Sequence, residues 1–446
     1  MAASRPYAFD LLRLAGPVAL ARLGIIGMAM TDVIVVGQLA PEELPHQALG
    51  WAPTAVFLVA AIGLLQGVQV LAARSLGEKN PAGAGVALRR GLVLALLAGV
   101  ASAALMWLGG LRLFTVFGID PALAAPSTPV MQVLAFSIPL HLLYIAGTYF
   151  LEAIKKPGIS TAVMWAANAV NLALNLLWVP EHGAIGSAWA TVGARVFLSG
   201  ALLACIYLLR DAKHYGVRGA RGAPGPSYGA LLGVGVAAAV SQAVEAGAFS
   251  AMTVIAGRIG AEVVAAYQIM LNLMAFVFMI ALGLAAATAV LVSEAIGRNA
   301  PHDSARAGWT GVWLNAITMV VAAALLLSFA YPIGRAYTAD LPLAALIASL
   351  MWVAALILTP DGTQVVTASA LRARGDNWFP TFSHIIAYAG VMPVLGFWFA
   401  EHQGMGVVGL LFAIFWSSVV SAAVLLLRWW TLTRKPASAG VMPDAA

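Results

Sequence analysis

The sequence predicts an all-α integral membrane protein with twelve transmembrane helices in two pseudo-symmetric six-helix lobes. Three observations lead to this prediction. Of the 446 residues, 62% are hydrophobic and only 9% are charged, whereas soluble domains have about 25% charged residues. Apolar runs of about 20 residues, the length that spans a bilayer, recur along the whole chain. The second half also repeats features of the first half at one fixed offset.

The apolar runs set the expected spans. The first run contains Asp32 and leads straight into further spans without a small-residue cleavage site, so we expect an uncleaved first helix. The twelve expected spans are 11–39, 49–73, 91–111, 128–152, 159–179, 184–209, 227–257, 262–295, 309–331, 341–371, 379–400 and 405–430.

The distribution of lysine and arginine sets the expected orientation. With both termini in the cytoplasm, 19 of the 24 lie on the inner side. Three (Arg112, Arg258 and Arg335) lie on the outer side, and two (Arg22 and Arg195) lie within spans. Cytoplasmic loops carry the excess of positive charge. We therefore expect a multi-pass protein of the cell inner (plasma) membrane with both termini in the cytoplasm.

A constant offset relates the two halves of the chain. Six residues recur 220 positions later, which predicts duplicated units of six helices in the same orientation. The pairs are Gly37 and Gly257, Glu42 and Glu262, Leu71 and Leu291, Gly77 and Gly297, Pro81 and Pro301, and Gly91 and Gly311. The expected organisation is an N-terminal lobe over 1–209, a flexible, basic, glycine- and proline-rich cytoplasmic linker over 210–226, a C-terminal lobe over 227–430 and a cytoplasmic tail over 431–446.

Composition also excludes several functions. The single cysteine, Cys205, rules out an internal disulfide and any CxxC metal or redox site. The sequence contains no HExxH or Walker A motif. The strings GPSYG and GMGVVG match GxSxG and GxGxxG, but neither follows an expected strand, the context that gives these motifs their function. We therefore expect neither an enzyme nor a bound cofactor. The positive charges occur singly or in pairs, which indicates contact with membrane lipids rather than nucleic acid.

Only three acidic residues are expected to lie deep within the spans: Asp32, Glu245 and Asp361. A charge inside the hydrocarbon costs several kcal/mol, so such residues are functional candidates by default. The alternative for any one of them is an internal ion pair with a buried arginine such as Arg22 or Arg195.

Asp361 lies about 16 Å from the cytoplasmic end of its span at the helical rise, which is near the midplane. Pro360 cannot donate to the carbonyl of Leu356, so we expect a kink that frees an oxygen beside the carboxylate. Thr359 and Gln364 add further oxygens. Oxygen clusters suit hard cations such as sodium, and burial favours the neutral form of a carboxylic acid, which suits proton uptake. The sequence permits either sodium or a proton at this position.

Two polar stripes accompany these acids. Gln268 and Asn272 are four residues apart on one expected helix, and Asn171 and Asn175 form a stripe on another that could face Asp32. The alternative for both stripes is hydrogen bonding between neighbouring helices.

These segments resemble the multidrug and toxic compound extrusion (MATE) transporters, particularly their NorM-like branch. The likeness covers nearly the whole chain. Its most specific parts are AAYQIMLNLMAFVFMIALGLAAATAVLVSEAIGR, PDGTQVVTASALRARGDNWFP, and PVALARLGIIGMAMTDVIVVGQLA, where Pro17 precedes Asp32 by fifteen residues and marks another expected kink. LEAIKKP and NLALNLLW also look like family segments.

The resemblance implies an antiporter that exports organic cations and lipophilic drugs by alternating access, driven by a proton or sodium gradient. Because the two lobes are fused in one chain, we expect a monomer to be sufficient. It places the cation site of the second lobe at Glu245 and Asp361, with Gln268 and Asn272 as polar positions near it. Sodium would be the metal at the two acids. The family pattern often has a tyrosine one turn before the second acid, where this sequence has Ile357. That departure tilts the prediction slightly toward protons.

In the first lobe, the resemblance assigns Asp32, Asn171 and Asn175 to a polar site for a proton or for substrate. The alternative within transport is a flippase for a lipid-linked or polyisoprenoid substrate, although such proteins often have basic cavities and fourteen helices. An intramembrane aspartyl protease would need Asp32 and Asp361 as partners, and they lie in opposite lobes. A structural scaffold would not need three buried acids, and a channel fits the proline-kinked site less well.

Overall fold

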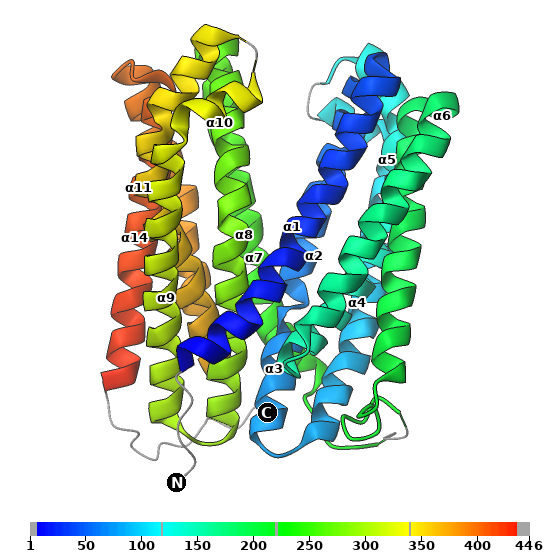
Figure 1. Ribbon diagram of the computed structural model, residues 1–446, viewed down its shortest axis with the longest axis vertical. Helices are drawn as coiled ribbons and strands as arrows, with labels where there is room; N and C mark the ends of the chain where they lie inside the picture. Colours follow the sequence, from blue (N-terminus) through cyan, green and yellow to red (C-terminus); the bar gives the residue numbers. More distant parts are fainter. Residues whose placement is uncertain (1–6, 117–118, 219–221, 339, 435–446) are drawn as a thin grey trace. The chain divides into compact units, whose positions relative to one another are not determined.

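The computed structural model describes residues 7–116, 119–218, 222–338 and 340–434 and is helical over most of them. The expected tail 431–446 therefore lies outside the described residues from position 435 onward. The elements in chain order are α1 (Tyr7–Leu39), the 3-10 turn η1 (Pro41–Glu43), α2 (Leu44–Leu64), α3 (Gln66–Gly77), α4 (Pro81–Val116), α5 (Pro121–Ala153), α6 (Pro157–Leu208), α7 (Tyr228–Ile259), α8 (Ala261–Gly297), α9 (Pro301–Ser328), α10 (Ala330–Tyr337), α11 (Leu341–Arg374), α12 (Trp378–His384), the π-helix η2 (Ile385–Val391), α13 (Met392–Gly396), the π-helix η3 (Phe397–His402) and α14 (Gly406–Arg434) (Figure 1).

The helices account for the expected spans. Within the described residues, 11 helical stretches are long and apolar enough to cross a membrane. One of them, α6, has 52 residues, far more than the roughly 20 that a span needs. Its backbone leaves helical geometry at Gly183, with φ 54° and ψ −134°, a conformation that glycine adopts readily. Because α6 is two helices joined at this glycine, the described chain holds twelve spans, and the all-α membrane prediction is confirmed.

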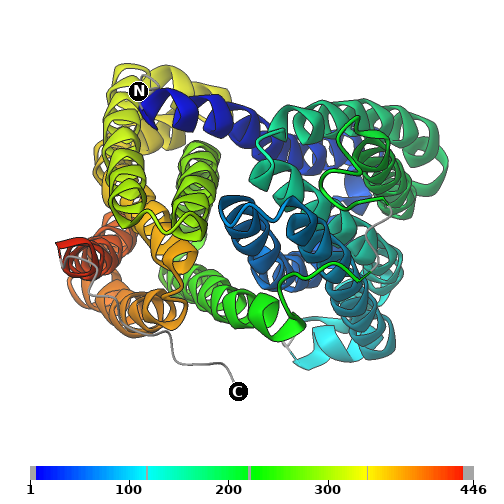
Figure 2. The same ribbon diagram turned by 90° about the horizontal axis from the view of Figure 1, so that it is seen from below.

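Residue contacts divide the chain into two units. The first unit is Arg13–Gly247, and the second joins the described parts of Met1–Leu12 and Ala248–Ala446. In the first unit α5 packs against α2, α4 and α6, and in the second α11 packs against α8, α9 and α14. Figure 2 shows the helices of each unit nearly end on. The division falls inside α1 and α7 rather than in the segment 210–226.

The local geometry repeats at the offset found in the sequence. Helix α3 ends at Gly77 and helix α8 ends at Gly297, while α4 and α9 begin at Pro81 and Pro301. Lys79 and Asn299, which are also 220 residues apart, both have a positive φ, of 59° and 54°. Such a backbone conformation is uncommon for residues other than glycine. Two copies of the same turn therefore connect equivalent helices, as the expected duplication requires.

The first half of α7 packs within the first unit through very close helix contacts. A Cβ atom on Gly235 would lie only 1.9 Å from the carbonyl oxygen of Leu64 at the end of α2. Likewise, a Cβ on Gly67 of α3 would lie 2.4 Å from the carbonyl oxygen of Leu231. Glycine at such crossings lets two membrane helices approach backbone to backbone. This contact explains why the first unit extends beyond the expected boundary at 209 to Gly247.

The segment expected to be a flexible linker is held against the first unit over its described residues. Arg89 and Arg90 of α4 donate hydrogen bonds to the carbonyl oxygens of Gly216 and Pro226. Asn80 donates to the carbonyl oxygen of Pro224 at 3.0 Å. In these contacts the carbonyl groups of the segment accept hydrogen bonds from protein side chains. The described part of the segment therefore lies along the surface of the first unit instead of extending into solvent.

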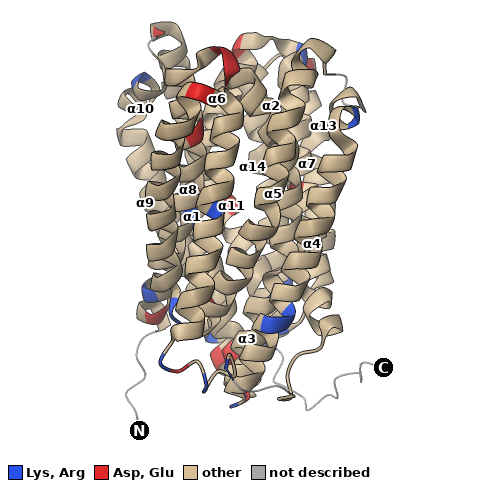
Figure 3. Ribbon diagram, turned by 90° about the vertical axis from the view of Figure 1, so that its right-hand side faces the viewer, with Lys and Arg blue, Asp and Glu red and all other residues tan. Residues whose placement is uncertain are grey.

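Charged residues gather toward the ends of the helices, and the middle of the helices is almost entirely uncharged (Figure 3). Several helix ends have recognisable signals. The side chain of Asp120 accepts a hydrogen bond from the amide of Ala122 at 2.8 Å where α5 begins, which satisfies a donor that has no partner within the helix. Helix α11 ends at Arg374 and is followed by Gly375 in the left-handed conformation, with φ 105°. Pro17 and Pro360 lie inside α1 and α11, and the kinks there remain predictions.

Candidate functional site

Asp32 is the centre of a buried polar cluster in the first unit. Only 7% of its surface is exposed. Its Oδ1 accepts hydrogen bonds from the amide groups of Asn171 at 2.9 Å and Asn175 at 2.8 Å, and its Oδ2 accepts one from the hydroxyl of Thr191 at 2.6 Å. The structure thus brings together Asp32 and both asparagines of the predicted stripe. It adds Thr191, which lies on the second part of α6 and which sequence spacing did not indicate.

Close packing of α1 on α6 positions this cluster. Asn168 donates to the carbonyl oxygen of Gly24 at 3.0 Å, and Thr161 donates to the carbonyl oxygen of Pro17 at 2.7 Å. The absence of a side chain at Gly24 leaves room for Met164, whose side chain would lie 2.4 Å from a Cβ there. Consequently Asp32, two turns further along α1, faces the same side of α6 that carries the asparagine stripe.

The donors around Asp32 are neutral, although a cation lies within electrostatic reach. Arg195 acts electrostatically on Asp32, but its Nη1 donates to the hydroxyl of Ser137 at 2.8 Å, and its guanidinium lies 5.4 Å from the ring centroid of Trp51. The amide oxygens of Asn171 and Asn175 have no hydrogen-bond partner among the described residues. They are therefore available to accept a hydrogen bond from a bound group.

Asp361 is the centre of a second cluster, in the second unit. Its Oδ1 accepts from the hydroxyl of Ser418 on α14 at 3.3 Å and from the hydroxyl of Tyr388 on η2 at 3.4 Å. These two hydroxyl oxygens are 3.4 Å apart. Ile357, which stands where the family pattern often has a tyrosine, is fully buried. A tyrosine oxygen nevertheless reaches Asp361, because η2 supplies Tyr388.

The remaining predicted positions lie outside these two clusters. Glu245 is partly exposed on α7 in the first unit, and Asp361 belongs to the second. Gln268 and Asn272 are exposed on α8, and the amide of Gln268 donates to the hydroxyl of Thr253 at 3.2 Å. Sequence reasoning placed Glu245, Gln268 and Asn272 near Asp361. Their proximity remains a prediction.

The structure also reveals a buried acid that sequence reasoning missed. Glu152, at the end of α5, has 2% of its side chain exposed, and its Oε1 lies 3.7 Å from Arg22 Nη2. The statement that only three acids lie deep is therefore wrong, and Arg22 pairs with Glu152 rather than with one of the three. The neighbouring Lys155 and Lys156 are typical of a helix end that faces water, where an acid such as Glu152 would be exposed. The apolar run before Glu152 was the available signal against that interpretation.

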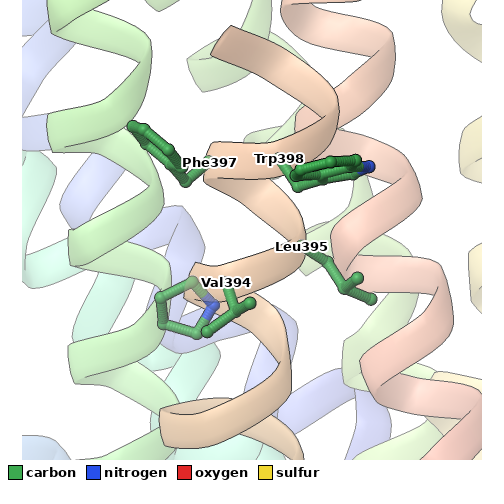
Figure 4. Close-up of a pocket in the computed structure, with 5 residues that line it drawn as sticks. Val394, Leu395, Phe397 and Trp398 are labelled. Atoms are coloured by element: carbon green, nitrogen blue, oxygen red, sulfur yellow. The ribbon is translucent and has the colours of Figure 1, made fainter. Parts of the chain in front are cut away.

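A groove on α13 and η3 is a poor candidate for the chemistry. Its lining residues are Pro393, Val394, Leu395, Phe397 and Trp398, all apolar or aromatic (Figure 4). Val394 is 66% exposed, which suits a surface that faces lipid. The groove offers no carboxylate, so the two clusters around Asp32 and Asp361 remain the candidate site.

The fold and the two clusters define a polytopic membrane protein made of duplicated halves, with a hydrogen-bonded carboxylate in each compact unit. The family described as MatE matches residues 17–177 and 237–398, two stretches that begin 220 residues apart. The chain belongs to this family, and the resemblance to NorM-like members is confirmed.

Named relatives agree with this membership. The probable multidrug resistance protein NorM of Caulobacter vibrioides is 42% identical over 428 residues, covering 94% of this chain and 90% of that protein. The multidrug resistance protein PmpM of Pseudomonas aeruginosa is 28% identical, covering 89% of this chain and 86% of that protein. A solved outward-facing multidrug resistance MATE family transporter has the same fold, with a TM-score of 0.88, 19% identity, and coverage of 97% of this chain and 98% of that chain.

Proposed function

We propose that this protein exports cationic and lipophilic small molecules across the cell membrane by antiport with protons or sodium. One observation carries the proposal: each compact unit holds a carboxylate, Asp32 or Asp361, whose hydrogen-bond donors are neutral side chains. Such a carboxylate can gain or lose an ion without first breaking a tight ion pair, whereas a fully paired buried charge is costly to uncouple. Family membership and the names of the relatives support multidrug efflux as the activity.

The proposed mechanism is exchange by differential affinity. A cation that binds at Asp361, with Glu245 as the second acid, neutralises the attraction for a positively charged drug, so the drug leaves on the outer side. Return of the protein to the inward state releases the cation into the cytoplasm. Asp32, with Asn171 and Asn175, binds either the drug or a proton. The termini lie in the cytoplasm, where the excess of lysine and arginine places them, and a single chain is sufficient.

The hydroxyl groups around Asp361 bear on the coupling ion. Sodium requires several oxygen ligands, and Ile357 removes one that the family pattern often provides. Tyr388 and Ser418 each bring an oxygen within 3.4 Å of the carboxylate, so the loss at Ile357 does not by itself favour protons. Replacing Tyr388 with phenylalanine removes one oxygen and keeps the ring. If the ion is sodium, Tyr388→Phe should raise the sodium concentration for half-maximal transport, and an unchanged value would exclude Tyr388 as a ligand.

The deciding experiment measures ethidium movement in proteoliposomes under an imposed proton gradient alone and under a sodium gradient alone. Glu245→Gln and Asp361→Asn should each abolish gradient-driven movement. Glu262→Gln is the matched control, because Glu262 is an exposed acid in the first turn of α8. Wild-type rates in Glu245→Gln or Asp361→Asn would contradict the cation site.

Asp32→Asn tests the first cluster separately. This variant should impair transport while leaving cation binding at the second cluster intact, as measured by isothermal titration of the purified protein. Complete loss of that binding would contradict the assignment of separate roles. If the wild-type protein moves no organic cation under either gradient, export of a lipid-linked or polyisoprenoid substrate becomes the better hypothesis.

A further inference from the structure

The buried pair of Arg22 and Glu152 has a place in the first unit that the mechanism above does not use. Arg22 lies on α1 ten residues before Asp32, which is about 15 Å along the helix. Glu152 is the second-last residue of α5, beside the loop that carries Lys155 and Lys156. The exposed fractions of the two side chains are 13% and 2%. The pair thus lies between the Asp32 cluster and the end of α5 that we place in the cytoplasm.

The pair is only partly satisfied. Glu152 Oε2 accepts a hydrogen bond from Gln69 of α3 at 2.5 Å, whereas Oε1 has no hydrogen-bond partner in the part of the chain that the structure describes and faces Arg22 Nη2 across 3.7 Å. That separation is too long for a hydrogen bond. The Nε of Arg22 also has no partner among the described residues, and its guanidinium lies 5.5 Å from the ring centroid of Tyr149. A buried ion pair offsets its desolvation only when its geometry is good and its remaining lone pairs are satisfied.

Oε1 is therefore a buried oxygen that accepts no hydrogen bond from any described residue. The other titratable groups facing the pair are tyrosines and a histidine of α5 and an arginine of α6. Tyr144 and Tyr149 act electrostatically on Arg22, and His141 lies within electrostatic reach of both Arg22 and Arg195. Among the described residues, Arg22 and Gln69 are the side chains that act most strongly on Glu152, and neither is a carboxylate. A proton entering this cluster has Glu152 Oε1 as its available carboxylate acceptor.

Duplication provides an independent comparison. At the offset of 220, Glu152 corresponds to Arg372, which is also buried, with 4% exposed. The equivalent place in the second half therefore holds a charge of opposite sign. Since the same scaffold accommodates either an acid or a base at this place, the fold alone does not require the carboxylate. The acid at 152 is a property of the first unit.

We propose that Glu152 is a second proton-binding site of the first unit, in which uptake of a proton on Oε1 releases Arg22 from the pair. The proton comes from water at the adjacent end of α5, and the neutral carboxylic acid keeps its contact with Gln69. Arg22 then has no counter-charge at this place. Because Arg22 and Asp32 are on the same helix, the change is transmitted along α1. This inference rests on the proposed antiport in assigning the site a role, but proton binding itself does not depend on transport.

The test is an infrared titration of the purified protein in detergent, between alkaline and acidic buffer, which follows the carbonyl band of protonated carboxylic acids. The background variant carries Asp32→Asn and Asp361→Asn, so that the other two clustered carboxylates are silent. The band grows on acidification as the remaining acids are protonated, and adding Glu152→Gln should remove the part of it that belongs to Glu152. An identical titration with and without Glu152→Gln would overturn the proposal.

A second variant separates proton binding from damage to the fold. Glu152→Gln leaves Arg22 buried and unpaired, so Arg22→Gln with Glu152→Gln removes both charges together. This double variant should fold as judged by its thermal melting, and it should also lack the Glu152 part of the band. A titration identical to that of the background variant would refute the assignment. If the wild type shows the Glu152 band but moves no drug under any gradient, the antiport proposal fails and the proton site stands.

Discussion

Replacing Thr191 with valine removes one hydrogen bond to Asp32 and keeps the side chain at a similar size. The bond is 2.6 Å long, within the range of charge-assisted O–H···O⁻ contacts. Hydrogen bonds to charged groups contribute about 1.5–3 kcal/mol, and neutral ones about 0.5–1.5 kcal/mol. Thr191→Val should therefore lower the free energy of unfolding by about 1.5–3 kcal/mol if Asp32 is ionised. In an Asp32→Asn background the loss should fall to the neutral range.

The difference between the two losses is the coupling energy, about 1 kcal/mol or more. We would measure it by titrating the protein in mixed micelles with a denaturing detergent and following tryptophan fluorescence. Thr310→Val is the matched control, because its hydroxyl makes an exposed hydrogen bond to a backbone carbonyl of its own helix. Equal losses in the wild-type and Asp32→Asn backgrounds would refute the view that Asp32 accepts this bond as an anion.

Two further predictions concern other parts of the first unit. The hydrogen bond and charge of Lys156, at 2.8 Å, hold the pKa of the exposed Asp211 below its usual value, so the stabilising contact is present at neutral pH and is lost as the pH falls through that lowered pKa. Lys156→Met should return the pKa of Asp211 toward its usual value in a carboxyl NMR titration. Gly235→Ala should cost about 1–3 kcal/mol by overpacking against Leu64, whereas Gly233→Ala, where a Cβ meets nothing within 4 Å, should be nearly neutral. Equal stability of the two alanine variants would contradict the close crossing of α2 and α7.

Hydrophobicity and duplication were enough to predict the fold, because both are properties of long segments. A span is defined by about 20 apolar residues, and an offset that recurs at Gly77 and Pro81 is visible without coordinates. The apolar runs predict a break between the spans 159–179 and 184–209, but they do not predict the non-helical backbone conformation of Gly183. The segment 210–226 has the composition of a tether, yet Arg89 and Arg90 bind its carbonyl groups. The composition of a segment carries no information about side chains elsewhere in the chain, such as these arginines of α4, that contact it.

The clusters were predictable only where helical spacing sufficed. Asn171 and Asn175 form a stripe because they are four residues apart, and the structure places that stripe on Asp32. Thr191, in contrast, reaches Asp32 from beyond the break in α6. Tyr388 reaches Asp361 from a different helix altogether. No periodicity within a single helix encodes such pairings, since they depend on how separate helices cross.

The assignment of the first half of α7 to the unit built from α2 to α6 has a consequence for any attempt to separate the two halves of the chain. A fragment that ends at position 209 would lack the segment that packs against the end of α2 and the start of α3. The close crossing of Gly235 on Leu64 belongs to that segment, so a separately produced first unit should include the residues up to Gly247.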